Sequence, residues 1–212
     1  MTSITQLPCE LVAAILSNLG SLHELINALV VCRHFYTSFK EHPSVAGDIV
    51  LSFFEPELLP LAVAAERVST LPTPRTAVAV RDFVDGLARS DRRLVSQMRS
   101  MPLRSLYSII DTEDSITDLA FDMAERAWND FDLYISRPVS LSPAEASRFI
   151  RAFYRTEIFF RAFCTHSTAP DPEVIRQSQL WLIMSFAQFE IEQIACVHDY
   201  LERVLVISEY LQ

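Results

Sequence analysis

The sequence predicts an all-α protein. Apolar residues recur at spacings of three and four along the chain, which is the periodicity of helices buried on one side. Only three glycines occur in 212 residues, few for the tight turns of an all-β fold. Half of the residues are hydrophobic and 21% are charged, so the chain is able to bury a sizeable core. We expect an N-terminal helical hairpin or three-helix motif at residues 1–42, packed on or followed by an irregular helical domain at residues 43–212.

A first helix is predicted near residues 8–19. Pro8 suits the first helical position, because the N–H that it lacks would be unpaired there, and Gly20 suits the left-handed residue that often closes a helix. The apolar stripe between them is Leu11, Ile15 and Leu19. These signals together predict one short helix.

A second helix is predicted to begin at once. Ser21 and Glu24, three residues apart, form a capping box. One apolar row follows at helical spacing: Leu25, Leu29, Cys32, Tyr36 and Phe39. A neighbouring row is also apolar: Ile26, Val30, Val31 and Phe35. One row is able to close on the first helix. The other requires a partner, either the rest of the chain or a different protein, because exposed apolar patches of that size are uncommon on monomers.

Further helices are predicted from proline, capping and acidic signals along the chain. They are expected near residues 44–54, 57–70 and 76–89, from Asp111 to Arg137, from Ser142, from Asp171, and over residues 190–212. A polar run and Met101-Pro102 predict a flexible connection around residues 90–104. No period of about 20 to 50 residues is visible, so a repeat array is not expected.

The N-terminal segment resembles a known family. Leu7-Pro8-Cys9-Glu10-Leu11, the aliphatic first helix and Val31-Cys32-Arg33 follow one another as in the F-box, the short helical motif of substrate receptors in cullin-based ubiquitin ligases. The resemblance covers residues 5–42, and Phe35 stands where the family often has tryptophan. RAFYRTEIFF and EIEQIACVHDYL, further along, also look like segments of fungal F-box-like proteins.

This resemblance implies a partner, a Skp-type adaptor that connects the chain to a cullin scaffold. Carried over by position, the adaptor-binding residues are Leu7, Pro8, Leu11, Ile15, Leu16, Val31 and Cys32. It further implies that the helical remainder binds a protein substrate, which no residue identifies. The alternative is a structural or interaction protein whose F-box-like hairpin only completes its own core.

Candidate catalytic and metal-ligating residues are few. Two Cys-x-His units occur, Cys164-Thr165-His166 and Cys196-Val197-His198. Residues two apart on a helix point about 200° apart, so neither pair converges on one ion or forms a nucleophile with its base. The four widely spaced cysteines are expected to be reduced, small apolar side chains. We expect no catalytic residue, no metal and no cofactor, and therefore no enzyme.

Charge and hydropathy argue against nucleic acid and membranes as partners. The formal net charge is -9, whereas nucleic-acid affinity depends on clustered cations. The densest basic segment holds Arg89, Arg92, Arg93, Arg99 and Arg104, without interleaved aromatic residues. A second row is Arg148, Arg151 and Arg155, which suits either solvent or a partner's acidic surface. With no membrane-length apolar run and no export signal, we expect a cytosolic or nuclear protein.

The cationic residues are unevenly divided. Lys40 is the only lysine, against 17 arginines. Codon usage in a GC-rich genome accounts for such a bias. The other explanation is that a receptor held in a ligase sits beside activated ubiquitin, which is attached chiefly to lysine amines, whereas arginine keeps the charge without offering a nucleophile.

Overall fold

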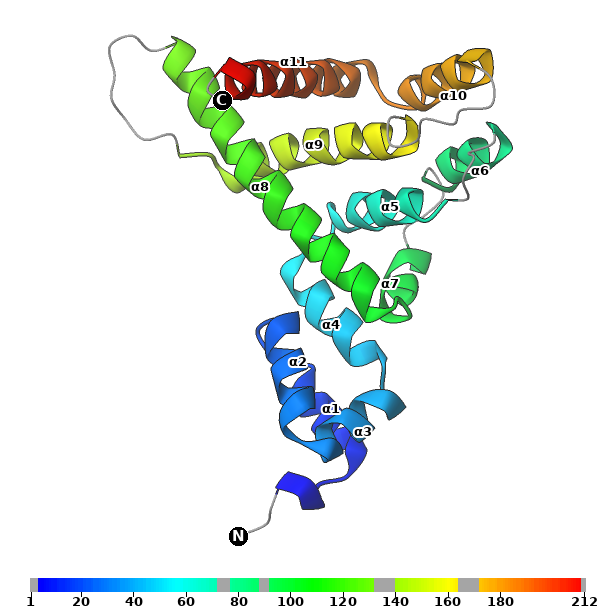
Figure 1. Ribbon diagram of the computed structural model, residues 1–212, viewed down its shortest axis with the longest axis vertical. Coiled ribbons are helices and arrows are strands. Elements are labelled where there is room, and N and C mark those ends of the chain that lie inside the picture. Colours follow the sequence, from blue (N-terminus) through cyan, green and yellow to red (C-terminus); the bar gives the residue numbers. More distant parts are fainter. Residues whose placement is uncertain (1–3, 72–76, 88–91, 132–139, 164–171, 211–212) are drawn as a thin grey trace. The chain divides into compact units, whose positions relative to one another are not determined.

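The computed structural model describes residues 4–71, 77–87, 92–131, 140–163 and 172–210. Within these ranges the secondary structure is helical and includes no strand (Figure 1), so the predicted all-α class is confirmed. None of the described helices is both long enough and apolar enough to span a membrane.

The N-terminal elements are a 3-10 helix, η1 (Ile4–Gln6), and the helices α1 (Cys9–Leu16), α2 (Leu22–Val31) and α3 (Arg33–Glu41). α1 ends three residues before the predicted Leu19, and Ser17 follows it with a right-handed backbone. Gly20 does not adopt the left-handed conformation expected of it. The Ser21 cap is as predicted, because the Ser21 side chain accepts a hydrogen bond from the Glu24 N–H at 3.1 Å.

The predicted second helix is divided at Cys32. Its backbone is extended, with φ -139° and ψ 122°, so Cys32 ends α2 and immediately precedes α3. No proline or glycine marks this break, and the apolar spacing passes through it. The observed arrangement is therefore the three-helix motif rather than a hairpin.

The next helices are α4 (Ser44–Phe53), α5 (Leu59–Ser69) and α6 (Ala77–Leu87), close to their predicted ranges. The expected connection at residues 90–104 instead contains α7 (Arg92–Arg99) and the beginning of α8 (Leu103–Phe131). The prediction failed there because α7 is recognisable mainly from its packing against α4, which is distant in sequence. The predicted helix end at Arg137-Pro138 lies outside the described residues.

The C-terminal helices are α9 (Pro143–Phe163), α10 (Pro172–Met184) and α11 (Gln188–Tyr210). α9 begins at the predicted capping box. Ser142 donates its hydroxyl to Glu145 at 2.6 Å, and the Glu145 N–H donates back to the Ser142 hydroxyl at 3.3 Å. The hydrogen bonds from Ser142 lower the pKa of the Glu145 carboxyl, which also suits its place in the first turn of a helix.

Contacts group the chain into two compact units. The first unit is Met1–Val63 with Ser90–Asp111, and the second unit is Ala64–Arg89 with Thr112–Gln212. Neither unit is one continuous stretch, so these units differ from the two sequence segments expected above. The expected domain boundary after residue 42 stays a prediction.

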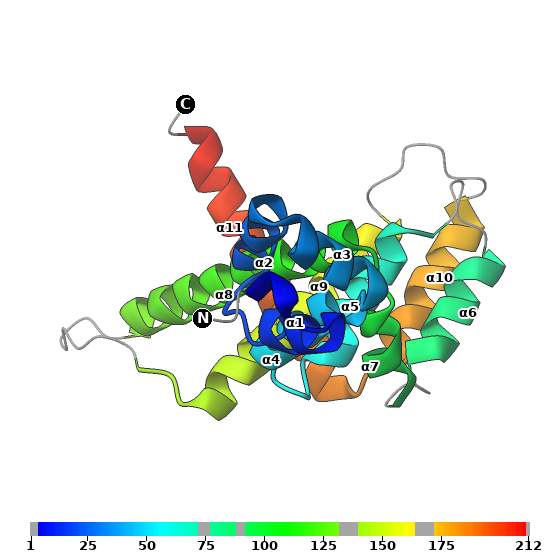
Figure 2. The same ribbon diagram turned by 90° about the horizontal axis from the view of Figure 1, so that it is seen from below.

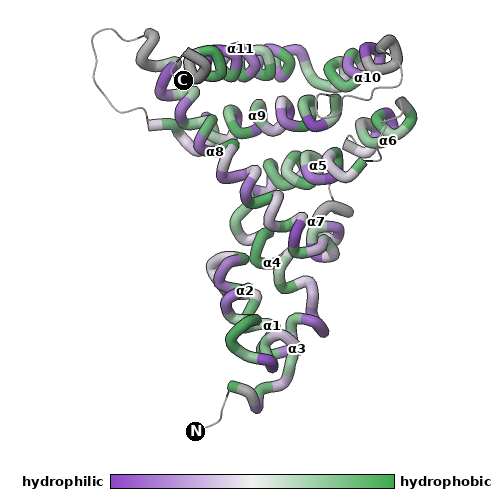
Figure 3. Tube along the Cα trace, viewed as in Figure 1, coloured by the Kyte–Doolittle hydropathy of each residue, from purple (hydrophilic) through white to green (hydrophobic). Residues whose placement is uncertain are grey.

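The first unit has an aliphatic core. α1 and α2 each pack on α3 and on α4, and Figures 1 and 2 both show α1, α2 and α3 side by side. Hydrophobic residues make up most of α1 (Figure 3). The largest fully buried side chains of the unit are Val12, Leu16, Leu22, Leu25, Ile49, Val50, Met98, Leu106 and Ile109.

α7 approaches α4 closely at Gly47. A Cβ added there would lie 2.6 Å from the Arg99 Cα atom, so only glycine permits this helix contact. Beside it, the Arg99 guanidinium donates to the Asp48 carboxylate at 2.6 Å. α7 is therefore an integral part of the first unit.

In the second unit α9 packs on α10 and α11, and α10 also packs on α6 (Figure 2). Its largest fully buried side chains are Tyr154, Ile158 and Leu182. The Phe153 and Tyr200 rings meet edge to face, with centroids 5.9 Å apart, and connect α9 to α11. Charged groups are also buried in this unit, namely Glu66 and Arg155.

Candidate protein-binding surface

α1 divides its apolar residues between a buried side and an exposed side. Val12 and Leu16 lie in the core, with Leu16 only 2% exposed. Leu11 and Ile15, one helical turn apart, are 53% and 46% exposed. A helix of eight residues thus offers two large apolar side chains to solvent.

The end of α2 is still more exposed. Val30 and Val31 are 81% and 82% exposed, and the extended backbone of Cys32 ends the helix directly after them. We call Leu11, Ile15, Val30 and Val31 the exposed apolar set. The predicted adaptor contacts include Val31 and omit Val30, although Val30 belongs to the second apolar row read from the sequence.

The other predicted adaptor contacts fall into three groups. Pro8 is exposed, and Leu7 and Cys32 are half-buried. His34 is hydrogen-bonded through Nε2 to the Leu7 carbonyl oxygen at 2.9 Å, which connects the segment before α1 to α3. The Leu16 side chain is part of the core, where it holds the motif together, and its predicted contact with the adaptor stays a prediction.

Covering the exposed apolar set would yield a substantial gain in free energy. Removing apolar surface from water yields about 25 cal/mol per Å², and one fully buried valine or leucine gains roughly 1.5–3 kcal/mol. Val30 and Val31 contribute almost none of this gain to folding, because they remain in water. The gain is available to a partner that covers them.

Comparison with known families places this surface in context. Residues 4–43 match the F-box-like family. The match runs from η1 to the second residue after the end of α3 and includes all four members of the exposed apolar set. Neither the curated proteins nor the solved structures give a significant match to the chain.

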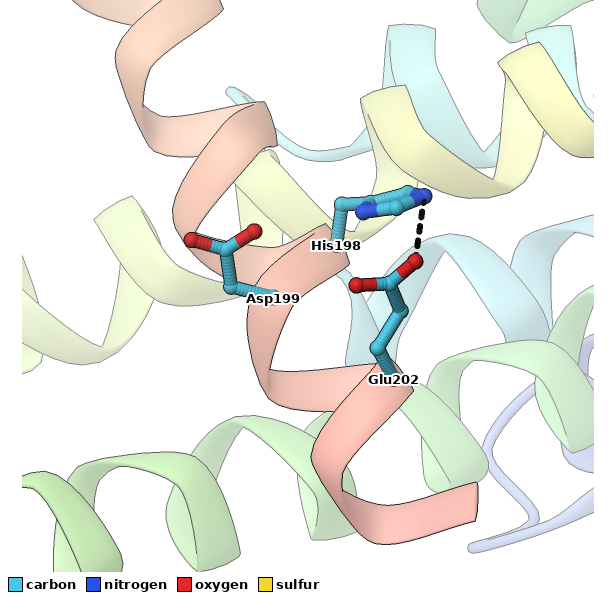
Figure 4. A group of neighbouring side chains, drawn as sticks. All are labelled: His198, Asp199 and Glu202. Atoms are coloured by element: carbon cyan, nitrogen blue, oxygen red, sulfur yellow. Dashed lines mark ion pairs between the residues drawn. The ribbon is translucent and has the colours of Figure 1, made fainter. Parts of the chain in front are cut away.

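A separate polar group lies on α11. His198, Asp199 and Glu202 offer ligand atoms within 4.8 Å of one another (Figure 4), and the His198 ring is stacked on Phe160 of α9 with centroids 6.4 Å apart. All three residues are exposed and belong to one helix, so they retain their hydration, and we assign no metal to them. Cys196 is exposed nearby in sequence, and the predicted unit of Cys164 and His166 lies outside the described residues.

The predicted basic row on α9 is not an open cationic face. The Arg155 side chain is 11% exposed and forms an ion pair with Glu190 of α11, and its guanidinium also lies 5.8 Å from the centre of the Phe186 ring. Burial lowers the pKa of Arg155, and the charge of Glu190 opposes that shift. Arg148 is exposed, but Arg151 has interactions of its own. This row is therefore largely used within the second unit.

The other basic segment is only partly described. Arg99 pairs with Asp48 and Arg104 is exposed, whereas the side chains of Arg89, Arg92 and Arg93 lie outside the described part of the chain.

Two further residues, Tyr154 and Arg161, make polar contacts inside the second unit. The Tyr154 hydroxyl donates to Glu113 at 2.5 Å, and burial, followed by the charge of Glu113, raises the pKa of Tyr154. Arg161 reaches several groups at once: Glu157 at 2.5 Å, the Thr112 hydroxyl at 2.9 Å and the Ala65 carbonyl oxygen at 3.3 Å. These contacts join α5, α8 and α9 within the unit and give partners to the Tyr154 hydroxyl and the Arg161 guanidinium.

Proposed function

We propose that this chain is a substrate receptor of a cullin-based ubiquitin ligase and binds a Skp-type adaptor through the exposed apolar set. F-box domains generally bind such adaptors. The observation that carries the proposal is the near-complete exposure of Val30 and Val31 inside the segment that matches the F-box-like family. Large apolar side chains concentrated in one short motif are typical of a protein interface.

The alternative is that the motif only completes its own core. The structure favours binding, because the core is already closed by Val12, Leu16 and Leu25, while the exposed apolar set takes no part in it. In this proposal Pro8 and the half-buried Leu7 and Cys32 lie at the margin of the interface. Leu16 supports the motif from inside.

The remaining helices are proposed to hold the protein substrate in the cytosol or nucleus. F-box proteins are generally adaptors rather than enzymes, in keeping with a recruiting role. The second unit presents apolar side chains to solvent on α10 and at the start of α11: Leu180, Met184 and Phe189. We propose these three residues as the first candidates for the substrate-binding region.

The test is titration of the 212-residue chain with a purified Skp-type adaptor by calorimetry. Leu11→Asp combined with Val31→Asp introduces two carboxylates into the exposed apolar set, and burying an unpaired charge costs several kcal/mol. We expect roughly 100-fold weaker binding or worse, since about 1.4 kcal/mol corresponds to a factor of ten. Both positions face solvent, so the helical content should not change.

Val78→Asp is the matched control. Val78 is 67% exposed on α6 in the second unit, so it receives the same chemical change outside the family match. Adaptor affinity should equal that of the wild type. Wild-type affinity in the Leu11→Asp, Val31→Asp variant would show that the adaptor does not use this surface. No binding by the wild-type chain would favour the alternative of a self-contained interaction protein.

A further inference from the structure

The chain offers ubiquitin a single lysine. Lys40 is the only lysine in the sequence, and its side chain is exposed in the last turn of α3. Tyr36, one turn earlier on the same face, is also exposed. Lys40 therefore lies on the solvent side of the motif, where a bulky reactant is able to reach its amine.

Some arginines form interactions that a lysine side chain would form poorly. Arg99, Arg126 and Arg161 each donate through Nε to a carboxylate, a geometry that belongs to guanidinium. Arg81 lies over the Trp181 ring, with its guanidinium carbon 5.2 Å from the ring centre. At these positions the local structure accounts for arginine.

Other arginines form no interaction of this kind among the described residues. Arg33, Arg67 and Arg104 are exposed, and among the described residues their side chains form no ion pair or hydrogen bond. An ammonium group would be equally well solvated at these positions. The depletion of lysine therefore extends beyond the sites where guanidinium geometry requires it.

We propose that this depletion confines ubiquitin attachment at side-chain amines to Lys40, and so slows modification of the receptor by its own ligase. The inference rests on the proposed function. A receptor held in a ligase keeps its surface at high effective concentration near the ubiquitin-carrying enzyme, so each reachable amine raises the rate of modification. Arginine, which stays protonated, supplies charge without a nucleophile.

The chemical step is acyl transfer. The neutral ε-amine of Lys40 attacks the carbonyl carbon of the thioester that joins ubiquitin to a conjugating enzyme. A C–N bond forms, the C–S bond breaks, the enzyme's cysteine leaves as thiolate and the amine proton passes to solvent. The product is an isopeptide at Lys40, and the remaining cationic side chains of the 212-residue chain, all arginines apart from histidine, form none.

The experiment compares variants of the 212-residue chain in a reconstituted ligase containing the adaptor, cullin and ubiquitin thioester. Attachment to wild type should map to Lys40 by mass spectrometry, and Lys40→Arg should abolish lysine-linked modification. Arg67→Lys with Arg104→Lys should raise the rate severalfold, because two exposed amines are added without a change of charge. Arg67→Gln with Arg104→Gln is the control that alters the same positions and adds no amine, and its rate should stay at the wild-type level.

Adaptor affinity, measured in parallel, separates the two proposals. If the adaptor binds and the lysine-added variant is modified at the wild-type rate, the inference fails, codon usage suffices and the proposed function stands. Equal modification of wild type and Lys40→Arg likewise overturns it. If the wild-type chain does not bind the adaptor, the proposed function and this inference fail together.

Discussion

The two units bury different kinds of side chain. Among the described residues, the first unit buries one polar residue, Ser38, within an otherwise apolar core. The second unit buries five polar residues, namely Glu66, Ser147, Arg155, Thr156 and Ser178. Apolar packing tolerates gradual change, whereas a buried charge requires its partner. The first unit is thus suited to presenting apolar side chains, and the second depends more on matched polar contacts.

The largest expected effect removes a buried charge from the second unit. Arg155→Met leaves Glu190, whose side chain is 21% exposed, without its cation, and breaking such a pair costs about 3 kcal/mol or more. Chemical denaturation should show this loss in the free energy of unfolding. Arg155→Met with Glu190→Gln should recover part of it.

Arg126→Met provides the exposed counterpart. Arg126 pairs with Asp122 while about half of its side chain is exposed, and a surface pair of this kind contributes little to stability. Equal losses in Arg155→Met and Arg126→Met would contradict the claim that the second unit depends on its buried ion pair more than on an exposed one.

A smaller effect concerns the contact between α4 and α7 in the first unit. Gly47→Ala forces a Cβ against the Arg99 backbone and should destabilise the unit by about 1–3 kcal/mol. Gly86→Ala, in the helix α6, meets nothing within 4 Å and should instead stabilise by up to about 1 kcal/mol. Opposite signs in thermal or urea unfolding confirm the close packing, and a neutral Gly47→Ala would contradict it.

The smallest effect depends on pH. Burial, together with a hydrogen bond to Asp122, raises the pKa of Tyr200 from 10.0 to about 12. The folded state therefore holds this proton more tightly than the unfolded state, so the stabilisation is complete below pH 10 and is lost as the pH rises toward about 12. Tyr200→Phe should lose less stability than wild type across that window. Parallel alkaline denaturation profiles would contradict the assignment.

Much of the fold was accessible from local signals in the sequence. Ser21 and Ser142 mark helix starts because their hydroxyls cap nearby N–H groups, a contact contained within four residues. α7 was missed because its position depends on Gly47, whose role appears only when a helix about 50 residues later packs against it. The break at Cys32 likewise lacks a local turn residue.

The candidate surface was predicted in part. The second apolar row indicated that α2 has an apolar face that packing on the first helix does not cover, and Val30 and Val31 are indeed exposed. Periodicity alone did not separate Leu16, which is buried, from Ile15, which is exposed, because both lie in a short aliphatic run. Which residue of such a run faces inward is decided by the packing of α1 on α3 and α4.

The contact between α4 and α7 also joins two segments that the ribosome synthesises at different times. Asp48 and Arg99, which form an ion pair there, are 51 residues apart, so a ribosome adding roughly 5–20 residues per second makes α4 several seconds before its partner. During that interval the nascent chain contains the α1–α3 motif and α4, while α4 still lacks its contact with α7. A fragment that stops at residue 63 would preserve this immature stage, whereas one that extends through residue 111 contains every segment of the first unit.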